Sequence, residues 1–279
     1  MSSVRSSRPR LALPFTIVAD RNTVHLIAGE DMRYSVRAGE ITTQLAELLR
    51  RCDGCQPLES LLGTVAESDR AAARELIGRL YGERILFDGP VEAFHRADRY
   101  YPATEGCGPL IDRLGCAKTQ GKPMAVLCQD SLDHHTALEF NRRCLGSGDG
   151  PWMWVTTGPA NRGYVSPVFL PGAGPCLACL LRHFQRLSPA PVLYDALIHH
   201  GEKGGNFTPA PFPKEALAIL EQIAIWKIQQ MNCTPAPAAG GGPSAVFRLH
   251  VLELEAMEVS VHRVFLDPTC PDCQDARLV

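Results

Sequence analysis

The sequence predicts an α/β protein in two parts, an α+β unit of the winged helix-turn-helix type followed by an α/β domain that holds a four-cysteine metal site. Three observations lead to this prediction. Short strand-like runs precede three amphipathic helical stripes in the first third of the chain, strand and helix patterns alternate after it, and two Cys-x-x-Cys pairs lie far apart. The 279 residues are enough for two ordinary domains.

The first unit begins with strands. Residues 15–19 and 24–28 are rich in β-branched and aromatic side chains and flank a turn at residues 20–22, and residues 34–36 predict a third strand. The arginines before the first strand, at Arg5, Arg8 and Arg10, indicate a solvated tail.

Three helices are predicted next. Leu45, Leu48 and Leu49 form one apolar stripe, which Gly54 is expected to end. Further stripes cover residues 58–65 and 72–80, the last beginning near the cap candidate Ser68. A strand at residues 85–87 follows. Because the stretch after it is polar and rich in proline and glycine, we place the domain boundary near residue 95, giving units 1–95 and 96–279.

The second unit alternates between strands and helices. Strands are predicted at residues 125–128, 152–157, 165–170, 247–251 and 257–261, the last two antiparallel. Helices are predicted at residues 133–144, 177–187 and 215–231, with an irregular connection over 189–213 and a flexible loop over 234–243. The helix at 215–231 is apolar on both sides, which predicts burial within one subunit or in a dimer interface.

Two cysteine pairs predict one structural zinc site. Each pair can donate two thiolates to a tetrahedral ion, and prolines beside both pairs favour knuckle turns over a redox couple or two surface thiol pairs. The predicted ligands are Cys176, Cys179, Cys270 and Cys273. His183 is a rival ligand, and the third pair, Cys52 and Cys55, indicates a helix-ending turn.

Composition excludes several classes of protein. The 28 basic and 30 acidic residues leave a net charge of -2, so nothing favours nucleic-acid binding. No window approaches the ~18 apolar residues of a membrane span. Eleven cysteines without an export signal indicate a reducing, cytoplasmic location.

A family resemblance rests on the run from Glu139 to Cys144, the Pro151-Trp152 strand start and the two cysteine pairs. Together they resemble the ThiF and ubiquitin-activating-enzyme superfamily, in which such cysteines hold zinc. The family's nucleotide loop is degenerate here, since Gly106-Cys107-Gly108 is the sole candidate and Ile111 stands in the third glycine's place. The magnesium-binding Asp matches Asp130 or Asp133, but the Arg expected after it is absent. The resemblance therefore implies lost adenylation chemistry, and no nucleotide or flavin is expected on this chain.

A narrower resemblance joins the N-terminal unit to the run Tyr164-Val165-Ser166-Pro167, the first cysteine pair and Arg182. This combination resembles the ThiF-like subunit of thiazole/oxazole-modified microcin synthetases, with its precursor-peptide recognition element. The resemblance implies a non-catalytic, homodimeric subunit of a peptide cyclodehydratase that binds the precursor's leader peptide and presents it to an ATP-using YcaO partner. A flavin-dependent azoline dehydrogenase can complete such complexes. The alternatives are an active ThiF-like adenylyltransferase and a winged-helix DNA-binding regulator.

The resemblance also implies where the leader binds. In this family's recognition element the leader adds as a strand to the sheet edge beside the third helix, so backbone hydrogen bonds supply much of the affinity. On this chain the edge comprises Met32, Arg33, Tyr34, Ser35 and Val36. The groove wall comprises Arg70, Arg74, Ile77, Leu80 and Tyr81. For any one of these side chains, an ordinary place in the core or on a solvated face is an equal alternative.

Overall fold

The computed structural model describes residues 7–29, 31–90, 118–119, 122–147, 150–233 and 245–275. The chain forms two compact units, residues 1–99 and 100–279, and each is described by itself. The predicted fold class is confirmed, because helices combine with antiparallel sheets in the first unit and with a mixed sheet in the second. Two predicted features, the Gly106-Cys107-Gly108 run and the loop at 234–243, lie outside the described residues.

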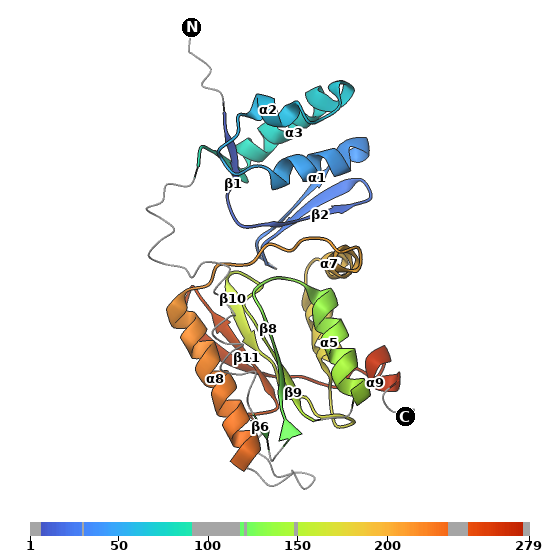
Figure 1. Ribbon diagram of the computed structural model, residues 1–279, viewed down its shortest axis with the longest axis vertical. Helices are drawn as coiled ribbons and strands as arrows, with labels where there is room; N and C mark the ends of the chain where they lie inside the picture. The colour runs from blue at the N-terminus through green and yellow to red at the C-terminus, as the bar shows by residue number, and fades with distance from the viewer. Residues whose placement is uncertain are drawn as a thin grey trace. The chain divides into compact units, whose positions relative to one another are not determined.

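The first unit is built on an antiparallel sheet with the order β2-β3-β4. Its strands are β2 (Thr16–Asp20), β3 (Thr23–Ile27) and β4 (Arg33–Arg37), followed by the helices α1 (Thr42–Arg50), α2 (Leu58–Leu62) and α3 (Arg70–Gly82). Figure 1 shows α1 lying along the sheet, with α2 and α3 beyond it. The apolar stripes of the helices and the inward side chains of β3 share one core, which includes Val24, Leu26, Leu45, Leu49 and Ile77. The stripes thus form helices because their apolar faces are buried against the sheet.

A two-stranded ribbon corrects two details of the prediction. β1 (Pro9–Leu11) pairs with β5 (Leu86–Asp88), so the basic segment at Arg10 is a strand and not a solvated tail. Gly54 does not end α1, which stops at Arg50. Gly54 has φ +81° and donates its N–H to the carbonyl of Pro9, and a Cβ there would lie 2.3 Å from the carbonyl oxygen of Gly89. The absence of a side chain at Gly54 therefore allows its backbone to lie close to the backbones of Pro9 and Gly89.

The start of α3 also differs from the prediction. The helix is preceded by a 3₁₀ turn at Glu67–Asp69, and the residue at its N-cap is Asp69, whose side chain makes no capping bond. Ser68 donates instead to the carboxylate of Asp69 at 3.1 Å, so it does not cap the helix.

The second unit contains a five-stranded sheet with the order β12-β11-β10-β9-β8, in which only the β8–β9 pair is parallel. Its strands are β8 (Ala125–Gln129), β9 (Trp152–Thr156), β10 (Arg162–Val165), β11 (Arg248–Glu253) and β12 (Glu258–Arg263). β6 (Lys118–Thr119) pairs antiparallel with β7 (Lys122–Pro123). The strand predicted at 165–170 is displaced, since β10 ends at Val165 and Phe169 bridges back to Trp152.

Helices cover both faces of this sheet. They are α5 (His134–Ser147), α6 (Leu177–Leu187), α7 (Val192–Glu202), α8 (Lys214–Cys233) and α9 (Pro271–Asp275). In Figure 1, α8 lies on one side of the sheet and α5 on the other. The prediction of an irregular connection over 189–213 is wrong over α7, whose buried Leu193 and Leu197 the many nearby prolines and glycines obscured. In the part of the chain that the structure describes, no helix is both long and apolar enough to cross a membrane.

The long helix α8 carries one buried charge. Its inner side, including Leu220 and Ala224, packs on the sheet, and Lys227 is fully buried among these apolar residues. The Lys227 ammonium donates to the carbonyl oxygens of Ser166 and Arg248, both at 2.6 Å. Burial lowers the pKa of Lys227 to about 7.

Candidate metal centre and peptide-binding edge

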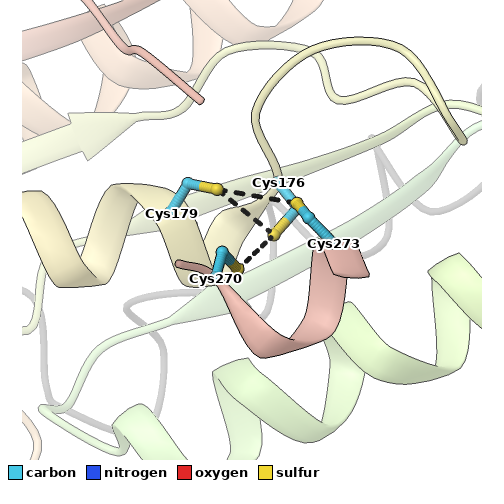
Figure 2. A group of neighbouring side chains, drawn as sticks. All are labelled: Cys176, Cys179, Cys270 and Cys273. Carbon is cyan, nitrogen blue, oxygen red and sulfur yellow. Dashed lines mark hydrogen bonds between the residues drawn. The ribbon is translucent and has the colours of Figure 1, made fainter. Parts of the chain in front are cut away.

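The structure brings the two cysteine pairs together in one buried cluster. Figure 2 shows Cys176 and Cys179 at the start of α6 facing Cys270 and Cys273 at α9. All four Sγ atoms lie within 4.8 Å of one another, and all four side chains are buried. The contacts between pairs measure 3.7 Å for Cys176–Cys270 and 3.6 Å for Cys179–Cys273, and the Cys176–Cys179 separation is 3.8 Å.

These separations fit a tetrahedral metal ion. A zinc–sulfur bond of about 2.3 Å in tetrahedral geometry places neighbouring sulfurs about 3.8 Å apart. The observed Sγ–Sγ separations are far longer than a disulfide bond of about 2.05 Å, and all four cysteines are free thiols. A set of four protein ligands leaves no position for water or substrate, so a metal held here would be structural.

Asn141 on α5 ties both cysteine segments together. Its Oδ1 accepts the backbone N–H of Leu177 at 2.9 Å, in the first turn of α6, and its Nδ2 donates to the carboxylate of Asp272 at 2.7 Å. The same Nδ2 lies 3.6 Å from the Sγ of Cys176. Asn141 is fully buried, so these bonds are shielded from water. Groups that orient ligands in this way tune metal affinity.

A second buried group, Asp267, holds the segment that leads into Cys270 by hydrogen bonds. Its Oδ2 accepts hydrogen bonds from Arg182 at 2.6 Å and Arg186 at 2.7 Å, while its Oδ1 accepts the Thr269 N–H at 2.9 Å. Burial raises the pKa of this carboxyl, but the hydrogen bonds from Arg182 and Thr269 outweigh burial and hold the pKa well below its usual range. The Asp267 N–H points to the Sγ of Cys179 at 3.4 Å.

Other metal-ligand candidates take no part in the cluster. His183 Nε2 lies 2.9 Å from the carbonyl oxygen of Phe265. Cys52 is buried while Cys55 is exposed, and the Cys52 thiol donates to the Leu48 carbonyl at 3.4 Å. Among the described residues, the four-cysteine group alone has metal-ligating geometry.

The two aspartates considered for magnesium lie at the end of β8 and the start of α5. The Asp133 carboxylate accepts the Thr136 N–H at 3.0 Å and the Thr136 hydroxyl at 2.7 Å, which is helix capping. Burial raises the pKa of Asp130, whose carbonyl accepts the Ala210 N–H.

The predicted peptide-binding edge lies on β4. In the described part of the chain β4 pairs with β3 alone. The bonds from the Ala28 N–H to Met32 and from the Ala38 N–H to Asn22 show that even-numbered residues of β4 turn their backbone groups toward β3. Because these directions alternate along a strand, the backbone N–H and C=O of Ser35 point to the open side.

The predicted groove wall divides into core and surface residues. Ile77 and Leu80 are 0% and 1% exposed, so they belong to the core, one of the two alternatives that the sequence left open. Arg70 donates to the carbonyl of Val65 at 3.2 Å, and Arg74 pairs with Glu59 at 2.6 Å.

Two half-buried tyrosines were considered near the edge, and of these Tyr34 lies on the edge strand while Tyr81 neighbours Ser7 and Asp88. Tyr34 on β4 and Tyr81 on α3 both pack against the core of the first unit. A hydrogen bond with Glu83, just past α3, raises the pKa of Tyr34 and links the end of α3 to β4. Sequence reasoning missed Glu83, because its distance along the chain gives no sign of this contact.

Comparison of this chain with known proteins gives similar solved structures and no similar sequence. No protein-family profile and no curated protein matches the sequence. A solved "heterocyclase in complex with substrate and cofactor" is 17% identical with a TM-score of 0.44, the heterocyclase TruD is 15% identical with a TM-score of 0.36, and a chain of the E. coli microcin synthetase McbBCD complex is 13% identical with a TM-score of 0.43. The matches cover 95%, 96% and 94% of this chain. This chain spans only 39% and 43% of the first two, and 99% of the third.

Proposed function

We propose that this protein is a non-catalytic, ThiF-like subunit of a peptide cyclodehydratase that binds the leader of a precursor peptide at the β4 edge. The observation that carries the proposal is the outward direction of the Ser35 backbone groups on a strand that, within the described ranges, pairs on one side alone. Such an edge is a template for an added strand.

Binding would proceed by strand addition. An incoming extended peptide would exchange hydrogen bonds with the outward N–H and C=O of Ser35, and its register would be set by side chains that meet Tyr34. The Tyr34 ring is half-buried and so offers apolar surface at this edge. Leader recognition of this kind does not require the leader to carry one fixed sequence along its whole length, because backbone bonds supply much of the affinity.

The four cysteines would hold a structural zinc ion. The bound ion would fix α9 against α6, and Asn141 and Asp267 would orient the segments that carry the thiolates. The residues of this chain would thus bind and position the leader peptide. The ring-forming chemistry would belong to a YcaO-type partner that uses ATP. The absent glycine at Ile111 supports this division of labour, since a phosphate-binding loop needs close backbone approach.

The proposal is tested with the full-length protein and a fluorescein-labelled leader from the precursor peptide encoded beside it. Ser35→Pro removes one outward donor and leaves the β3–β4 ladder intact, so leader affinity by fluorescence anisotropy should fall about tenfold. Ser35→Ala is the matched control, because both variants lose the Ser35 hydroxyl that lies 2.8 Å from His25 Nδ1. Equal affinity of the two variants would contradict binding at this edge.

The non-catalytic role needs a separate measurement. Calorimetric titration with magnesium ATP should give no binding heat on the isolated protein. Micromolar binding would instead support the adenylyltransferase alternative.

A further inference from the structure

The strand β12 at the edge of the second unit's sheet exposes apolar side chains. Val259 and Val261 are 37% and 46% exposed, and Met257, in the turn just before the strand, is 46% exposed. In the described ranges β12 pairs with β11 alone. A long edge strand with exposed apolar residues would be a liability unless something covers it.

The backbone of β12 is directed so that it can receive another strand. The Leu254 N–H donates to the Asn161 carbonyl on the β10 side, so even-numbered residues of β11 face β10 and odd-numbered ones face β12. Val251 is opposite Ser260 in the β11–β12 register. Ser260 therefore turns its backbone groups toward β11, and its neighbours Val259 and Val261 turn theirs to the open side.

The side chains of Val259 and Val261 belong to the face of the sheet that α8 covers. Val259 is opposite Leu252, which packs in the core with α8, and Val261 is opposite His250. His250 meets the ring of Trp226 on α8 edge-on, with ring centroids 6.2 Å apart. Trp226 is itself only half-buried. Val259, Val261 and α8 therefore lie on the same face of the sheet.

We propose that a second copy of this chain covers β12, by antiparallel pairing of β12 with β12 about a two-fold axis at Ser260. This register places Val259 opposite Val261 of the second copy, and both residues have outward backbone groups. It also places Glu258 opposite His262 of the second copy, so a carboxylate meets an imidazole twice in the dimer. An isologous interface requires such self-complementarity.

The neighbouring registers are poorer. An axis at Val259 places Glu258 opposite Ser260, and an axis at Val261 places His262 opposite Ser260, so neither makes the Glu–His pair. With the axis at Ser260, perpendicular to the sheet, the two five-stranded sheets become one continuous sheet with both α8 helices on the same face. The family resemblance implies a homodimer, and the helix at 215–231 was the candidate interface; this pairing would place the interface at β12 instead.

Crosslinking tests the register. Ser260 would face its own copy as a non-hydrogen-bonded pair with Cα atoms about 4.5 Å apart, within disulfide range. Under mild oxidation Ser260→Cys should form a dimer whose linked peptides, identified by mass spectrometry, join residue 260 to residue 260. Val261→Cys is the matched control. Its two copies would be offset by two residues, about 7 Å along the strands alone, so no crosslink is expected.

Association tests the charge pairing. Light scattering should give twice the 30.5 kDa of the chain. Glu258→Lys should weaken the dimer about tenfold, because an unfavourable pair arises twice, and adding His262→Glu should restore it. A monomer at all concentrations, a dimer insensitive to Glu258→Lys, or a crosslink at residue 261 and not at 260 would overturn the proposal. Leader binding is measured separately, so failure here leaves the proposed function standing.

Discussion

Replacement of Asn141 by leucine should break the hydrogen bonds that join both cysteine segments to this residue of α5. The side chain is of similar size, but the Leu177 N–H and the Asp272 carboxylate lose a partner. A buried group left without its hydrogen bond costs about 1–3 kcal/mol, more for a charged one, so the total is about 3–5 kcal/mol. For a unit of this size each kcal/mol lowers Tm by about 2–4 °C, which predicts a fall of roughly 6–20 °C.

The assay is thermal unfolding followed by tryptophan fluorescence. All three tryptophans, Trp152, Trp154 and Trp226, belong to the second unit, so the signal reports that unit. Metal release to a chromogenic chelator should be faster in the same variant. Arg142→Met is the control, since its contact with Asp272 is 3.4 Å long and the Arg142 side chain is 57% exposed. A Tm within about 2 °C of the control would refute the role given to Asn141.

Two further changes probe the second unit. Cys273→Ser should release the metal and abolish the cooperative tryptophan unfolding transition, and a folded, metal-free variant measured by atomic absorption would show that the cluster is not a structural metal site. Burial lowers the pKa of Lys227 to about 7, against about 10.4 when unfolded, so above pH 7 the unfolded state binds more protons and stability rises with pH. Urea unfolding at pH 7 and pH 9 should show a gain of about 2 kcal/mol that is absent in Lys227→Met; equal gains would place the titration elsewhere.

Local patterns predicted most of the elements. The stripe of Leu45, Leu48 and Leu49 and the alternation around Val259 gave α1 and β12 directly, because their periods match the burial of one face. The prediction of an irregular connection over 189–213 missed α7, because the prolines and glycines there flank the helix and do not interrupt it. The strand β1 was not predicted, because its three residues form a strand only by pairing with β5, some eighty residues away.

The cysteine cluster could be predicted from the sequence because thiol pairs have a recognisable spacing. The groups that support the cluster could not be predicted in this way. Asn141 stands in the run that carries the family resemblance, yet nothing in that run indicates that its amide reaches Asp272, 131 positions away. The direction of the Ser35 backbone likewise depends on the register with β3, which the sequence leaves open by one residue.

The two cysteine pairs also set an order of events during synthesis. Cys176 and Cys270 are 94 positions apart, so at about 5–20 residues per second the first pair waits roughly 5–20 s for its partners to be made. Throughout that interval Cys176 and Cys179 are accessible thiols that must remain reduced. The first unit has no such dependence among the residues that the structure describes, where its core ends at Leu86. The nascent chain would therefore present a finished β4 edge while the metal centre is still unassembled.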